Sequence, residues 1–175
     1  MSIARSVEEY LRERGVRYEV LTHRPTHLSM ESAHVAHVPP ECLAKAVVLC
    51  DDQGYVMAVT PADHRLRLGA LHRRFGRPLG LATEQEVRRL FKDCEPGAVP
   101  PLGALYGMEV IVDETLDGRP EIYFEGGNHR DLVRVSGEDF RRLLPDALQG
   151  AISGAGAEAH AAGHPALGDS KGEQG

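Results

Sequence analysis

Two apolar segments separated by a short polar turn constrain the fold of this chain more than any other feature. The segments LAKAVVLC at 43–50 and YVMAVTP at 55–61 are typical of strands, and DDQG at 51–54 is typical of a turn. We therefore predict a β-hairpin over 43–61. With 42% hydrophobic residues in a chain of 175, a core can form around it without a disulfide or a metal.

Capping residues and turn signals divide the rest of the chain into short elements. Capping-box patterns begin two predicted helices, at Ser6 and at Thr83. Ser29 and Ser136 are placed to cap two more. Because hairpins and helices separate the strands unevenly, we expect an α+β fold, in which helices surround a curved, mixed, mostly antiparallel sheet or partial barrel. The predicted helices cover 6–14, 30–38, 67–75, 84–91 and 138–144. The other predicted strands cover 17–21, 108–114, 121–127 and 131–135. We predict a turn at LDGR, between the strands 108–114 and 121–127.

The composition changes after Gly150. The segment 151–175 consists mainly of Gly, Ala and Ser with scattered charges, which is typical of a disordered tail. We expect one folded domain at 1–150 and a disordered tail at 151–175.

The charge and the cysteine content indicate the cellular compartment and limit the classes of binding partner. The net charge of −6 argues against a protein that holds nucleic acid by bulk electrostatics. The arginines nevertheless cluster, five of them within 65–77, either as solvated helix faces or as a local basic rim for phosphates. Three cysteines without a CxxC pair indicate a reducing compartment, and no apolar run suits a membrane span or a signal peptide. We expect a cytoplasmic protein with no membrane partner.

Lys45 is the most informative single residue. It is one of only three lysines, and it lies inside the apolar strand LAKAVVLC on the same face as Val47 and Leu49. Such an ammonium either extends to solvent at a strand edge or lines a pocket that binds an anion. Both interpretations remain open at this point.

Two glycine-bearing segments are further candidates. The loop EPGAVPPLG at 95–103 combines flexible glycines with a stiff Pro-Pro pair, so it either presents backbone groups to a ligand or is a rigid connector. The segment FEGGNHRDL at 124–132 either brings backbone and His129 close to a substrate or is an ordinary turn. The loop at 95–103 matches no nucleotide-binding fingerprint, and the histidine pairs 23/27 and 34/37 lack completing ligands, so we expect no metal and no cofactor.

The order of these features resembles the YbaK/prolyl-tRNA synthetase-associated domain family of editing aminoacyl-tRNA deacylases. The resemblance covers about 6–147 and rests on a Ser-bearing N-terminal loop, LAKAVVL, PAD, PGAVPPLG and YFEGGNHRDLVRVSGEDF in this order. It implies a mixed α/β fold, hydrolysis of the ester between a wrong amino acid and the tRNA 3′ end, and the tRNA acceptor end as partner. It implies a catalytic set of Lys45, Gly97 and Gly103 and a substrate-binding set of Thr26, Ser29, Met30, Pro100, Pro101, Gly127 and His129.

Two departures from the family pattern leave the substrate open. Ala46 stands where one branch has Asn, and GGNHR stands where another has GTHR. Small residues in the expected pocket indicate a small amino acid such as Ala, Ser or Cys. One competing hypothesis is a non-catalytic module that binds tRNA or a synthetase, and the acidic net charge favours a partner protein that delivers the tRNA. The other is an unrelated small-molecule hydrolase.

Overall fold

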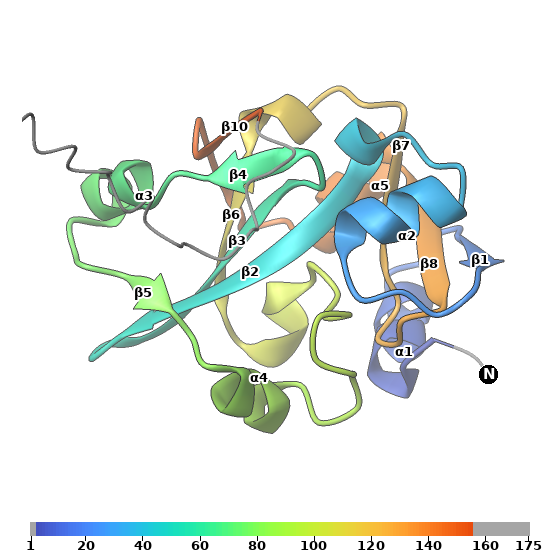
Figure 1. Ribbon diagram of the computed structural model, residues 1–175, viewed down its shortest axis with the longest axis horizontal. Coiled ribbons are helices and arrows are strands. Elements are labelled where there is room, and N and C mark those ends of the chain that lie inside the picture. The colour runs from blue at the N-terminus through green and yellow to red at the C-terminus, as the bar shows by residue number, and fades with distance from the viewer. Residues whose placement is uncertain (1–2, 156–175) are drawn as a thin grey trace, which may run out of the picture.

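The structure, a computed structural model, describes residues 3–155 and has a mixed α/β architecture (Figure 1). This confirms the predicted fold class. The helices are α1 (Arg5–Glu13), α2 (Ser29–Val35), α3 (Leu68–Phe75), α4 (Glu84–Leu90) and α5 (Gly137–Leu143), with 3-10 turns η1 (Pro40–Cys42), η2 (Gly103–Tyr106) and η3 (Glu114–Leu116). The strands are β1 (Glu19–Thr22), β2 (Leu43–Asp51), β3 (Gly54–Pro61), β4 (His64–Leu66), β5 (Gly80–Leu81), β6 (Glu109–Asp113), β7 (Glu121–Glu125), β8 (Asp131–Ser136), β9 (Leu148–Gly150) and β10 (Ser153–Ala155).

The predicted hairpin forms the centre of the main sheet. Strands β2 and β3 pair antiparallel, with Lys45 opposite Thr60, and the strand order is β1-β8-β7-β2-β3-β6-β9. The pairs β2–β7, β3–β6 and β6–β9 are parallel, so the sheet is mixed. Strands β6 and β7 do not pair, and the segment between them, which the sequence predicted to be a simple turn, contains η3 and crosses to another part of the sheet.

One edge of β2 is only partly covered. On the side away from β3, strand β7 pairs with β2 at Leu43 and Ala44, and β5 pairs with it at Leu49 and Cys50. Between these two contacts, no strand formed by the described residues lies beside 45–47 on that edge. This opening in the sheet positions the site described below.

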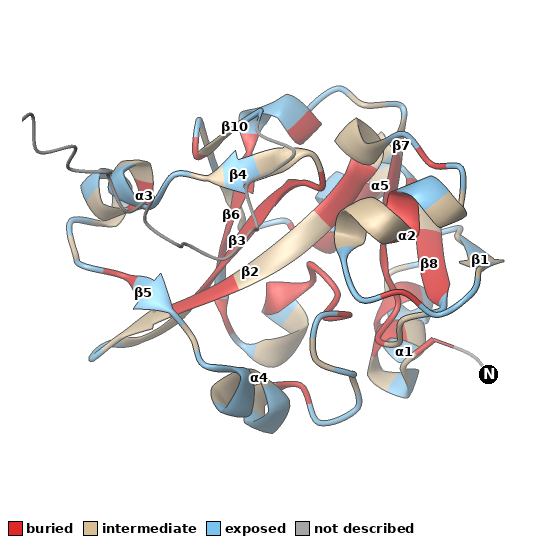
Figure 2. Cartoon of the chain, in the orientation of Figure 1, coloured by how far each residue is buried: buried red, intermediate tan, exposed pale blue. Residues whose placement is uncertain are grey.

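The core is divided between the two faces of the sheet. On one face, α1 and α5 pack on the largest apolar cluster, to which Ala44 and Val48 of β2 belong. On the other face, α2 packs on a cluster around Leu43, and α3 packs on a separate cluster around Leu49. Figure 2 shows buried residues concentrated along β3, β7 and β8, whereas α4 and β5 are exposed or intermediate.

Two predicted caps are confirmed and two are wrong. Thr83 forms a full capping box with Glu86, and the Ser136 hydroxyl accepts the N–H of Asp139. Helix α1 begins after Ala4, and the Ser6 hydroxyl instead donates to the carboxylate of Asp93, a contact distant in sequence. Ser29 is the first residue of α2 and makes no side-chain cap.

The chain continues as part of the fold beyond Gly150. Strand β10 pairs with β4, and the Asp113 carboxylate accepts the N–H groups of Ile152 and Ser153 at 3.0 and 2.9 Å. The first five residues of the predicted tail are therefore ordered parts of the domain. The remainder of that tail, 156–175, lies outside the described residues.

Candidate active site

A cavity of about 240 Å³ lies at the uncovered edge of β2. It receives side chains from β2, from the end of β7, from the start of α2, from the segment leading into α4 and from the loop 95–103. It thus brings together three residues of the predicted site, Ser29, Lys45 and Gly97, which are far apart in sequence. The other lining residues are Ala46, Val47, Val48, Leu81, Ala82, Val87, Val99 and Glu125.

Lys45 extends from β2 toward the turn between β3 and β4. Its ammonium donates hydrogen bonds to the backbone carbonyls of His64 at 2.6 Å and Ala62 at 3.5 Å. Because an ammonium has three N–H donors, one remains for a ligand. Burial lowers the pKa of Lys45, and the nearby Asp63 carboxylate opposes this to a smaller extent. The lysine is therefore a half-buried, fixed cation at the cavity, not a strand-end lysine extended into solvent.

Glu125 is a functional candidate that is absent from the predicted site. It ends β7 and is only 4% exposed. One carboxylate oxygen accepts the Ser32 hydroxyl at 3.0 Å, and the other is buried without a hydrogen-bond partner among the described residues. Burial raises the pKa of Glu125 to about 7, against the opposing effect of the Ser32 hydrogen bond. The only available signal was the alternation of EIYFE, which places Glu125 on the same face as Tyr123.

The loop 95–103 begins with a turn that sets the backbone of Gly97. The N–H of Ala98 donates to the carbonyl of Glu95 at 3.0 Å, and Gly97 has φ +84°. Pro96 followed by a glycine with positive φ is typical of a type II turn. A Cβ at Gly97 would lie 3.2 Å from Cε1 of His129, so the two predicted site residues touch beside the cavity. No hydrogen bond of the described residues uses the N–H of Gly97.

The remaining predicted site residues do not line the cavity, and their roles stay predictions. Thr26 is buried behind it, where its hydroxyl and that of Ser32 are 2.5 Å apart. Met30 lines a different hollow of α2. A Cβ at Gly103 would lie 2.5 Å from Val110, and one at Gly127 would lie 2.7 Å from Ala4, so both glycines are sites of close packing. The Pro100-Pro101 pair is buried.

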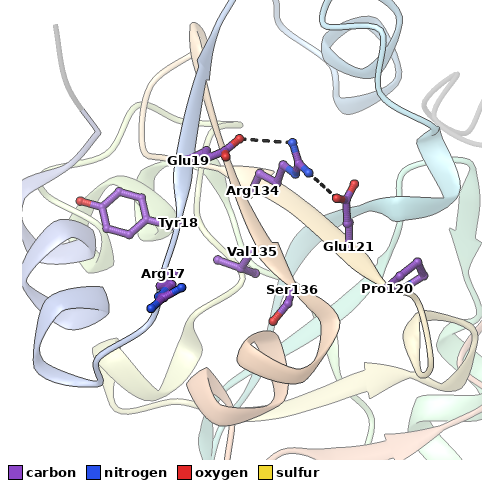
Figure 3. Close-up of a pocket in the computed structure, with 8 residues that line it drawn as sticks. All are labelled: Arg17, Tyr18, Glu19, Pro120, Glu121, Arg134, Val135 and Ser136. Carbon is purple, nitrogen blue, oxygen red and sulfur yellow. Dashed lines mark hydrogen bonds and ion pairs between the residues drawn. The ribbon is translucent and has the colours of Figure 1, made fainter.

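A second hollow, of about 320 Å³, lies over β1, β7 and β8 (Figure 3). Its Arg134 is already held by two carboxylates, that of Glu19 at 3.2 Å and that of Glu121. A cation with two carboxylate partners has little capacity left for a ligand anion. At the β2 edge, by contrast, Lys45 gives its hydrogen bonds to two backbone carbonyls and forms no ion pair within residues 3–155, so that cavity is the better candidate.

None of the helices in 3–155 combines the length and apolar character that a membrane span requires. Within the same residues, no three His, Cys, Asp or Glu side chains are grouped as metal ligands would be.

These features define a mixed α/β domain with a lysine-bearing pocket at a sheet opening. Residues 23–143, more than half of the chain, match the model of the aminoacyl-tRNA editing domain family, and the chain belongs to that family. This confirms the resemblance seen in the sequence.

Solved structures agree with the family assignment. A candidate trans-editing enzyme for prolyl tRNA synthetase is 29% identical, with a TM-score of 0.75 over 87% of this chain and 97% of that one. The hypothetical protein APE2540 is 26% identical, with a TM-score of 0.76 over 85% of this chain and 99% of that one. A search of curated proteins found no match to this chain.

Proposed function

We propose that this chain is a trans-editing aminoacyl-tRNA deacylase, which hydrolyses the ester of a mischarged tRNA carrying a small amino acid. The observation that carries the proposal is the fixed ammonium of Lys45 beside the cavity at the β2 edge, with one donor left for a ligand. Membership of the editing-domain family supports the reaction class. The likeness to a candidate trans-editing enzyme supports action in trans.

The reaction needs no strong base from the protein, because an aminoacyl ester is already activated toward attack by water. Lys45 donates to an anionic or carbonyl oxygen of the tRNA 3′ end and fixes the ester. The N–H of Gly97 orients the ester carbonyl and stabilises the negative charge that develops on it when water adds. The bond between the carbonyl carbon and the ribose oxygen then breaks, releasing the amino acid and the ribose hydroxyl. Placement of the ester and the water supplies most of the rate enhancement.

The size of the cavity favours a small amino acid. Pockets for small molecules usually measure roughly 300–1,000 Å³, whereas this one measures about 240 Å³. Part of that space must hold the terminal ribose. The walls beside Lys45 are formed by small or medium apolar residues such as Ala46 and Val99.

The test is a deacylation screen with tRNAs mischarged with Ala, Ser or Cys, using the wild type and Lys45→Ala. We expect turnover of at least one substrate by the wild type and its loss in the variant. Tight binding of tRNA without turnover would favour a non-catalytic module instead. Hydrolysis of simple aminoacyl esters but of no aminoacyl-tRNA would indicate a small-molecule hydrolase.

A further inference from the structure

Glu125 is a buried carboxylate that the mechanism above does not use. It lines the same cavity as Lys45 and Gly97, yet it is only 4% exposed. Its Oε1 accepts the Ser32 hydroxyl at 3.0 Å, whereas its Oε2 is buried and has no hydrogen-bond partner among the described residues. A buried, unpaired carboxylate oxygen destabilises a fold, and a ligand in the cavity that supplied the missing donor would remove this cost.

The position of this carboxylate is fixed from behind. Ser32 on α2 donates to Glu125. Ser32 and Thr26 are both buried, and their hydroxyl oxygens are 2.5 Å apart. Thr26 is itself bonded to the segment 124–132, because its N–H donates to the carbonyl of His129 at 3.1 Å. These contacts hold Oε1 toward α2 and leave Oε2 as the carboxylate oxygen without a hydrogen-bond partner among the described residues.

Among the described residues that line the cavity, Lys45 is the one cation and Glu125 the one anion, and Asp63, which does not line it, acts on the Lys45 ammonium from nearby. The ammonium of Lys45 is turned toward the carbonyls of Ala62 and His64, and no ion pair of the described residues joins it to Glu125. The end of an aminoacyl-tRNA has the same two charges, a backbone phosphate on one side of the ester and an α-ammonium on the other. A site with separated charges of both signs is complementary to this ligand.

We propose that Glu125 binds the α-amino group of the aminoacyl ester through Oε2 and so selects esters with a free amino group over N-acylated ones. This inference rests on the proposed function and adds a subsite to it. The pKa of Glu125, raised by burial to about 7, agrees with a carboxylate that becomes fully ionised when an ammonium occupies the site.

The kinetic test compares alanyl-tRNA with N-acetylalanyl-tRNA as substrates of the wild type, Glu125→Gln and Glu125→Met. Glu109→Gln, an exposed position on β6, is the matched control. We expect the wild type to prefer the free amine roughly 10- to 100-fold in kcat/KM, the range for a hydrogen bond to a charged group. Both Glu125 variants should lose this preference by slowing on alanyl-tRNA alone, and the control should keep it. Equal slowing on both substrates, or an unchanged preference, would overturn the proposal.

A binding measurement separates this inference from the proposed function. Calorimetry with the non-hydrolysable amide 3′-alanylamino-3′-deoxyadenosine and its N-acetyl form needs no catalysis. We expect the wild type to bind the free-amine form more tightly and the Glu125 variants to bind both forms alike. If the wild type binds both forms equally, the inference is wrong even where deacylation is observed. If it discriminates between them but turns over no aminoacyl-tRNA, the proposed function is wrong and the amino-group subsite stands.

Discussion

Replacing Glu125 with glutamine should remove a pH-dependent destabilisation of the folded protein. The folded state raises the pKa of this carboxyl from 4.5 to about 7, mainly through burial. Between these values the folded protein retains a proton that the unfolded chain has released. The free energy of unfolding must therefore fall as the pH rises through this interval. Glutamine has nearly the same shape and does not titrate, so the variant lacks this contribution.

The expected size follows from the two pKa values. Each unit of pKa difference corresponds to about 1.4 kcal/mol. From about pH 5 to about pH 8, the wild type should lose roughly 2 to 3 kcal/mol of unfolding free energy relative to Glu125→Gln. Because other carboxylates titrate alike in both proteins, the difference between the two isolates Glu125.

Urea unfolding of both proteins at several pH values in this interval provides the measurement. The exposed Glu109→Gln variant is the control, and its difference from the wild type should stay nearly constant with pH. A flat difference for Glu125→Gln would refute the argument. So would a variant that becomes relatively less stable as the pH rises, because that would mean the folded state favours the ionised carboxylate.

Two glycine substitutions test the loop 95–103. Gly97→Ala places a Cβ 3.2 Å from His129 in a backbone of positive φ and should therefore displace the turn. We expect kcat/KM for deacylation to fall roughly 10- to 100-fold. A rate equal to that of the wild type would show that Gly97 is not part of the site. Gly103→Ala places a Cβ 2.5 Å from Val110, so calorimetry should show a loss of about 1–3 kcal/mol in unfolding free energy, and an unchanged melting temperature would contradict the close packing.

Local patterns in the sequence predicted the elements better than their pairing. The hairpin over 43–61 and the Thr83 capping box depend on residues a few positions apart, and both are confirmed. The Ser6 cap failed because Asp93, distant in the chain, competes for the same hydroxyl. The parallel pairing of β2 with β7 likewise joins segments about eighty residues apart, which no local pattern encodes.

The candidate site was only partly predictable for the same reason. The contrast between one lysine and its apolar strand pointed to Lys45, but whether its ammonium reached solvent depended on the carbonyls of the β3–β4 turn. Glu125 looked like an ordinary strand residue, because its burial is imposed by α2 and Ser32, far away in sequence.

The central claim is that the cavity at the β2 edge is a deacylase site organised around Lys45. The most direct test measures single-turnover deacylation of the preferred mischarged tRNA by the wild type, Lys45→Ala and Lys92→Ala, the last of which alters an exposed lysine just after α4. Loss of a donor that stabilises the reacting ester should slow Lys45→Ala roughly 100- to 1,000-fold. Its unfolding transition should persist, and Lys92→Ala should match the wild type. A Lys45→Ala protein that is folded and deacylates at the wild-type rate would contradict the account.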